Sequence, residues 1–184
     1  IRDRGDMRKD QSTLLLPEVM DKSYVFDEFH PLIFEPVLSP QAIKCIGDYF
    51  EHGIKHNHFP FGDRQSKRFK TRDDPVSRML HYEMLPLIEK CTGVKVRPTY
   101  TYLSCYVKGS DLPAHTDQVD CEFTVSYMLS KPEGSSWPIH YHMIKQPKKY
   151  NGRYDFTPPV DECIPCDCVP GGFMMFTGQD HIHF

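Results

Sequence analysis

A histidine and an aspartate stand one residue apart in LPAHTDQVDCEFTVSYML, residues 112–129. Alternate residues of a β-strand point to the same side, so His115 and Asp117 can present an imidazole and a carboxylate together. A second imidazole would complete the facial set of donors that holds a non-haem Fe(II) ion and leaves positions open for other ligands. The His-x-Asp pair is therefore either half of a metal site or a polar turn ahead of a strand.

The end of the sequence supplies candidates for the missing imidazole. VPGGFMMFTGQDHIHF, residues 169–184, contains a Pro-Gly turn, an apolar strand, a further glycine, and then His181 and His183. A barrel would bring such a distant strand beside the His-x-Asp pair. The two histidines share strand parity, so spacing alone leaves either one as the third ligand.

Two helices are predicted in the N-terminal half of the chain, ahead of the strands that would carry these residues. HPLIFEPVLSPQAIKCIGDYFEHG predicts a strand and then a helix with Ser39 as its N-cap and Gly53 at its end. DDPVSRMLHYEMLPLIEKCTG predicts a second helix capped by Asp74, with an apolar face that includes Met79. Each helix has a proline at its first position. Pro86, inside the second pattern, predicts a kink or a break.

After Gly93 the sequence changes to short segments rich in β-branched and aromatic residues. VKVRPTYTYLSCYV, CEFTVSYMLS, SWPIHYHMI and GGFMMFTG are separated by Gly-, Pro- and Lys-rich turns. The predicted fold class is mainly β within an α+β arrangement, with the N-terminal helices packed on one side of an antiparallel β-domain. Residues 1–30 are expected to form an extension and residues 31–184 a single domain.

About half of the chain, from Arg97 to Phe184, resembles the 2-oxoglutarate- and Fe(II)-dependent oxygenases, particularly their prolyl-hydroxylase-like branch. The shared pattern is a tyrosine, a glycine and His-x-Asp entering a strand, then Pro-Gly, an apolar strand, a glycine, and a histidine followed by an aromatic residue. Here these elements are Tyr106, Gly109, His115-Thr116-Asp117, Pro170-Gly171, Phe173 to Phe176, Gly178 and His183-Phe184. The resemblance implies a double-stranded β-helix core of the jelly-roll or cupin-like kind.

The resemblance also implies a ligand set. His115 and Asp117 would be the first two metal ligands. The interval from the preceding glycine and the following Phe184 favour His183 as the third, with His181 as its rival.

Residues that contact the co-substrate are implied as well. Tyr106 would hydrogen-bond the far carboxylate of 2-oxoglutarate, and Thr124 would line the same pocket. Members of this family also grip that carboxylate with an Arg or Lys roughly ten residues after the third ligand, through a charge-assisted contact. Because the sequence begins with Ile1 and stops at Phe184, we expect that residue, and the last strand of the domain, beyond Phe184.

Substrate contacts are expected from Tyr102, which shares strand parity with Tyr106, and from Trp137 and Arg68. Arg68 belongs to a basic segment, residues 59–74, which is either a solvated loop or a lid over the site.

The resemblance implies Fe(II) as cofactor, 2-oxoglutarate and O2 as co-substrates, succinate and CO2 as co-products, and stimulation by ascorbate. The expected reaction is hydroxylation of an unactivated C–H bond, although desaturation or cyclisation can arise from the same chemistry. The substrate would be a small amino-acid-like molecule or a protein side chain. The alternative is a non-catalytic, cupin-like module that binds a metal or another ligand.

Composition bears on partners and compartment. A net charge of -3 gives no general attraction to nucleic acid or to membrane surfaces. No apolar run approaches the ~20 residues that a membrane span requires. Seven cysteines, an odd number and mostly scattered, favour free thiols in a reducing, cytoplasmic environment over a disulfide framework. The oligomeric state is not predicted.

Two further motifs each allow two interpretations. Cys163, Cys166 and Cys168 form C-x2-C-x-C, which is either a group of free thiols or part of a zinc site. His140 and His142, at strand spacing, are either ordinary strand residues or a second pair of metal ligands.

Overall fold

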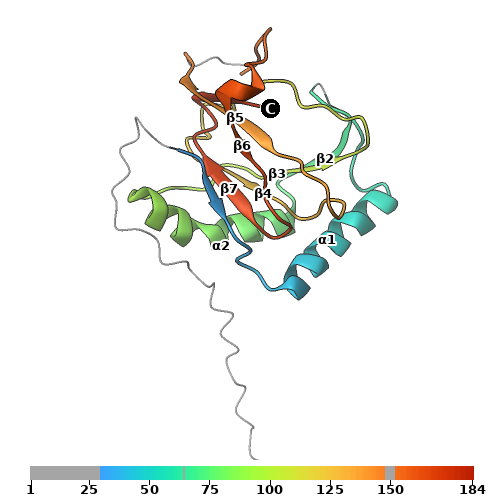
Figure 1. Cartoon of the computed structure of the whole chain (residues 1–184). Helices are drawn as coiled ribbons and strands as arrows, with labels where there is room; N and C mark the ends of the chain where they lie inside the picture. The colour runs from blue at the N-terminus through green and yellow to red at the C-terminus, as the bar shows by residue number, and fades with distance from the viewer. Residues whose placement is uncertain (1–29, 64, 148–151) are drawn as a thin grey trace, which may run out of the picture.

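The computed structural model describes residues 30–63, 65–147 and 152–184. It is a mixed α+β structure in which antiparallel sheets predominate, with two helices along one side of the strands (Figure 1). Among the described strands, the sheets do not close into a barrel. The expected N-terminal extension lies outside the described residues, apart from His30. No described helix has the length and apolar character needed to cross a bilayer.

Helix α1, Pro40–Lys55, begins as predicted. The Ser39 hydroxyl accepts a hydrogen bond from the Ala42 N–H at 3.2 Å, which satisfies one of the free donors at a helix start. The prediction that Gly53 ends this helix is wrong, because the helix continues to Lys55. Gly53 is instead buried inside the last turn, where the ring of Phe59 occupies the space that a Cβ would need.

Helix α2, Pro75–Thr92, is capped by Asp74, whose carboxylate accepts from the Val76 N–H at 2.9 Å. It ends at Gly93, which adopts the left-handed conformation with φ 71°. Of the two outcomes predicted for Pro86, a break is wrong, since the helix runs through it without interruption, and a kink stays a prediction. Met79 was expected on the buried face, yet it is 54% exposed.

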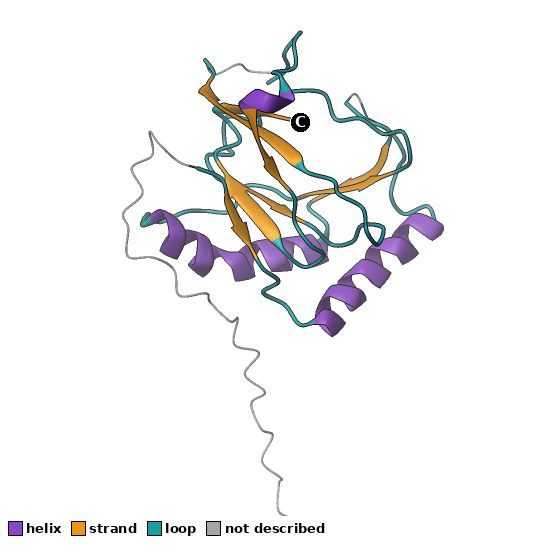
Figure 2. Ribbon diagram, in the orientation of Figure 1, coloured by secondary structure: helices purple, strands orange, loops and turns teal. Residues whose placement is uncertain are grey.

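Eight strands are described, and they form three antiparallel sheets with the orders β1-β7-β4, β2-β3 and β6-β5-β8 (Figure 2). Their bounds are β1 Leu32–Phe34, β2 Arg68–Arg72, β3 Tyr102–Tyr106, β4 Thr124–Tyr127, β5 Ile139–Lys145, β6 Cys163–Cys166, β7 Phe173–Phe176 and β8 His181–His183. A short 3-10 helix, η2 Val160–Glu162, precedes β6.

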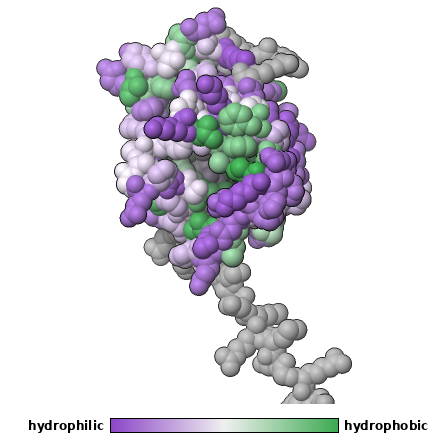
Figure 3. Space-filling view, turned by 90° about the vertical axis from the view of Figure 1, so that its right-hand side faces the viewer, coloured by the Kyte–Doolittle hydropathy of each residue, from purple (hydrophilic) through white to green (hydrophobic). Residues whose placement is uncertain are grey.

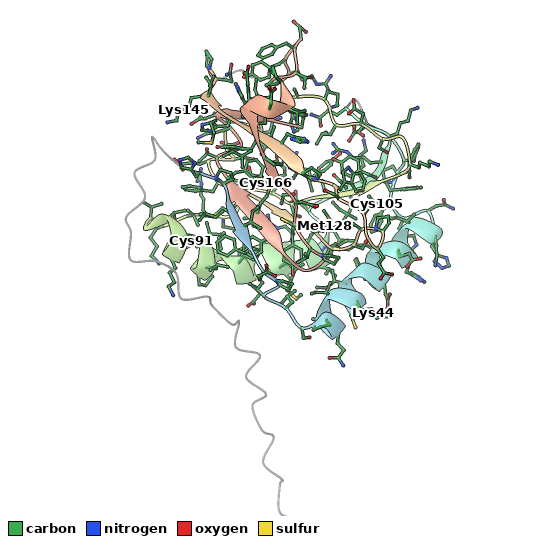
Figure 4. All side chains as sticks on the ribbon, in the orientation of Figure 1. Lys44, Cys91, Cys105, Met128, Lys145 and Cys166 are labelled. Carbon is green, nitrogen blue, oxygen red and sulfur yellow. The ribbon has the colours of Figure 1, made fainter. Side chains whose placement is uncertain are left out.

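Strand β7 is buried on both faces and joins two layers of the core. Phe173 and Met175 pack against the inner side of α2, which includes Cys91. Met174 and Phe176 point the other way and pack against the β6-β5-β8 sheet through residues such as Cys166. Figure 4 shows Cys91 and Cys166 on these two sides. Each buried side chain of this size stabilises the fold by about 1.5–3 kcal/mol, so β7 is held firmly in place.

Two glycines of α1 provide a matched test of the packing around its last turn. Gly47→Ala should raise the free energy of unfolding by up to about 1 kcal/mol, because its Cβ meets nothing within 4 Å and Ala favours a helix. Gly53→Ala should lower it by about 1–3 kcal/mol, because its Cβ overlaps with the buried Phe59 ring. Urea unfolding of the two variants measures both changes, and stabilisation by Gly53→Ala would contradict the packing described here.

Candidate metal centre

The backbones of His115 and His183 lie side by side. The His115 N–H donates to the His183 carbonyl at 3.1 Å, and the His183 N–H donates back to the His115 carbonyl at 2.9 Å. Residues that exchange both hydrogen bonds across an antiparallel pair project their side chains to the same face. The two imidazole rings accordingly lie 4.3 Å apart between centroids.

Asp117 reaches the same point from two residues further along the chain. Its N–H donates to the Gly178 carbonyl at 2.8 Å, which fixes the segment beside the turn before β8. Its Oδ1 atom lies 3.9 Å from Nε2 of His115 and 3.6 Å from Nε2 of His183. Two bonds of about 2.1 Å to one ion can span at most about 4.2 Å, so Asp117 can share an ion with each histidine.

Hydrogen bonds at the far side of each ring determine which nitrogen is available. The Nδ1 atom of His115 lies 2.9 Å from the Pro113 carbonyl oxygen, and Nδ1 of His183 lies 3.1 Å from the His181 carbonyl oxygen. A carbonyl oxygen only accepts, so each Nδ1 carries a proton, and the neutral form of each ring then has its lone pair at Nε2. Metal-binding histidines are typically oriented in this way by a partner behind the ring.

The charge states of the cluster also suit a cation. Burial, followed by the neighbouring His183, lowers the pKa of His115 to about 4, so this imidazole is neutral at pH 7. Burial by itself would raise the pKa of Asp117, but the His183 imidazole and the Thr124 hydroxyl hold it at about 2. At neutral pH the site therefore offers an ionised carboxylate and an uncharged imidazole as donors.

Thr124 and Gly178 hold the aspartate in position. The Thr124 hydroxyl donates to Oδ2 of Asp117 at 2.6 Å, which leaves Oδ1 toward the two histidines. A Cβ at position 178 would overlap with both Oδ2 of Asp117 and the Thr124 hydroxyl. The sequence pattern contains this glycine, but its spacing gives no sign that it makes room for the carboxylate. The predicted contact between Thr124 and 2-oxoglutarate stays a prediction.

His181 has different surroundings from His183. Its Nδ1 atom lies 2.8 Å from the Thr177 hydroxyl, and its ring centroid lies 5.0 Å from that of Tyr141. The pairing of β8 with β5 is irregular, with Tyr141 opposite His183 and Lys145 opposite His181. The geometry brings His183, and not His181, to the His-x-Asp pair.

Of the remaining predicted site residues, all except Arg68 line one cavity. It has a volume of about 2650 Å³ and is lined by Asp117, Thr124 and His183 together with the aromatic residues Tyr102, Tyr106 and Trp137. On the face turned toward the viewer in Figure 3, hydrophobic side chains surround a hollow. Arg68 lies behind the tyrosines instead of at the cavity surface, with 5% of its surface exposed. Arg64, in the same basic segment, lies outside the described residues.

Among the described residues, neither the cysteine motif nor the pair His140 and His142 forms a group of three donors that could share an ion. Cys166 and Cys168 are part of the apolar core, and all seven cysteines of the chain are free thiols. The ring of His140 stacks on Phe184, and Nε2 of His142 lies 4.0 Å from Glu162. Within residues 30–63, 65–147 and 152–184, one group of three or more donors is close enough to share an ion. Its members are His115, Asp117 and His183.

No protein-family model matches this chain, and no curated protein matches its sequence significantly. Its function is therefore inferred from the geometry of the donors.

Removing the Thr124 hydroxyl should weaken the site without removing a ligand. Thr124→Val keeps the shape of the side chain but frees the Asp117 carboxylate to rotate, so we expect metal affinity to fall about 10- to 100-fold. Thr124→Ser retains the donor and should bind the metal within a few-fold of the natural chain. Calorimetric titration with Fe(II) or Mn(II) under nitrogen measures both, and equal affinities for the two variants would contradict this role.

Proposed function

We propose that this protein is an Fe(II)- and 2-oxoglutarate-dependent oxygenase that hydroxylates a C–H bond of its substrate. The observation that carries the proposal is the convergence of His115, Asp117 and His183, in which Nε2 of both imidazoles lies within 4 Å of the Asp117 carboxylate. Two imidazoles and one carboxylate on one side of an ion are typical of non-haem Fe(II) oxygenases. A structural zinc site normally has four protein ligands, and the described cluster offers three.

The residues of the cluster fit such an ion. The donors are uncharged imidazole nitrogen and carboxylate oxygen, which suit Fe(II) better than a soft metal that prefers thiolate. Fe(II) held by His115, Asp117 and His183 would supply the oxidising chemistry, in which 2-oxoglutarate and O2 give succinate, CO2 and a hydroxylated product. The chain itself positions the reactants and excludes competing reactions.

The cavity residues have separate parts in this proposal. Thr124 keeps Asp117 oriented toward the ion, and Tyr106 presents its hydroxyl to a carboxylate of 2-oxoglutarate. Tyr102 and Trp137, each about two-fifths exposed, would contact the substrate at the cavity mouth. The cavity that Tyr102, Tyr106 and Trp137 line is the same one that Asp117 and His183 line, so co-substrate and substrate would both reach the ion from it.

The sheets support a double-stranded β-helix as the finer description of the fold. The β1-β7-β4 and β6-β5-β8 sheets face each other across Met174, Phe176 and Tyr141, as the two sheets of a jelly roll do. Of the three donors, His183 lies on β8, and His115 and Asp117 lie on the segment beside it.

A pair of asparagine substitutions tests the ligand set and the activity together. Asparagine imitates the Nδ1 side of an imidazole but has no atom at the Nε2 position. With Fe(II), ascorbate and 2-oxoglutarate under air, His183→Asn should lower succinate formation to the uncatalysed background. His181→Asn should retain most of it, because His181 contacts Thr177 and Tyr141 and not the ion.

Two outcomes would overturn parts of this proposal. If His181→Asn abolished succinate while His183→Asn did not, the ligand set would be wrong. If the natural chain bound Fe(II) but produced no succinate, the protein would be a metal-binding module of the cupin-like kind and not an oxygenase.

A further inference from the structure

Arg68 is a buried arginine with three different acceptors. From β2, its Nε donates to Asp63 at 2.8 Å, its Nη1 to the Tyr106 hydroxyl at 2.7 Å and its Nη2 to Gln65 at 3.1 Å. Its guanidinium carbon also lies 5.0 Å and 5.4 Å from the ring centroids of Tyr102 and Tyr106. With 6% of its side chain exposed, Arg68 has a fixed position and meets no ligand directly.

Four hydrogen bonds hold the Asp63 carboxylate. Its Oδ1 accepts from the backbone N–H groups of Gln65 and Ser66, at 2.7 and 2.8 Å. Its Oδ2 accepts from Arg68 and from the Tyr102 hydroxyl at 2.9 Å. Both oxygens of Asp63 are thus satisfied, and the Nη1 atom of the guanidinium is the one that donates to Tyr106.

The contact with Arg68 decides what the Tyr106 hydroxyl can bind. A guanidinium has no acceptor, so the phenol oxygen accepts from Arg68 and its own proton must be donated elsewhere. Among the described residues no acceptor for that proton accompanies the bond to Arg68. Tyr106 lines the same cavity as Asp117 and His183, and Trp137 packs edge-on against its ring at 5.4 Å. The free proton is therefore available to a ligand in the cavity.

We propose that Arg68 makes Tyr106 a charge-assisted donor for a carboxylate in this cavity, namely the far carboxylate of 2-oxoglutarate. Hydrogen bonds in a chain polarise one another, so donation from a guanidinium strengthens the O–H of the tyrosine as a donor. Arg68 is thus a positioning residue that acts through Tyr106 and not a substrate contact. This inference rests on the proposed function for the identity of the ligand.

The test compares 2-oxoglutarate with 2-oxopentanoate, which has the same 2-oxo acid but a methyl group in place of the far carboxylate. Binding of each acid to the metal-loaded protein is measured by calorimetry under nitrogen. The natural chain should prefer 2-oxoglutarate at least 100-fold. Tyr106→Phe and Arg68→Met should each reduce that preference about tenfold or more. The double variant should lose little beyond either single change, because both act on one hydrogen-bonded chain.

Two controls separate this role from a general effect on folding. Lys67→Ala removes a positive charge from the same loop at an exposed position and should leave the preference unchanged. Tyr106→Phe leaves Arg68 and Asp63 paired, so it tests the subsite even if Arg68→Met fails to fold. In that case Arg68→Lys, which keeps a charge but lacks the planar fork, tests the arginine and should also reduce the preference.

The outcomes distinguish the subsite from the oxygenase activity. Succinate formation with an undiminished preference in Tyr106→Phe or in the Arg68 variants would overturn the subsite and leave the activity standing. A preference that falls as expected, in a chain that forms no succinate, would support the subsite and overturn the activity. Binding of neither acid by the natural chain would overturn both.

Discussion

The reciprocal backbone pairing of His115 with His183 is the constraint on which the rest of the site depends. It brings together two segments that are far apart in the sequence and gives both imidazoles the same direction. Asp117 then reaches the cluster because it is two residues beyond His115 and is bonded to Gly178. A change that separated these two backbones would therefore disperse all three donors at once, whereas a change at one side chain would remove only one.

The pairing is itself supported by the packing of the strands on either side of it. β7 is buried on both faces, so the turn that follows it, with Gly178, starts from a fixed position. β5 pairs with β8 on the other side and places the buried Tyr141 opposite His183. Close-packed protein interiors are barely compressible, so a displacement of one buried residue moves its neighbours. The buried side chains of β7 and β5 therefore keep the site rigid, although they are not among the three donors.

Sequence signals were reliable where the determining contacts are local. Ser39 and Asp74 cap helices as predicted, because an N-cap depends on atoms two or three residues away. The predicted helix end at Gly53 and the predicted break at Pro86 were wrong, because tertiary context can carry a helix through a glycine or a proline. For the same reason no spacing rule could assign Arg68, whose partner Tyr106 lies on another strand.

The polar groups around Asp117 and those around Tyr106 favour ligands of opposite charge. Around Asp117, an ionised carboxylate and two imidazoles lie close enough together to share a cation. Around Tyr106, a guanidinium and a phenol proton create a place for an anion. Both groups border one cavity, since Asp117, His183 and Tyr106 all line it. A ligand that binds a metal at one end and carries a carboxylate at the other satisfies both, and a 2-oxo diacid has this form. A simple monoacid or an amine would leave one of the two networks without a partner, at a cost of about 1–3 kcal/mol for the unmet group.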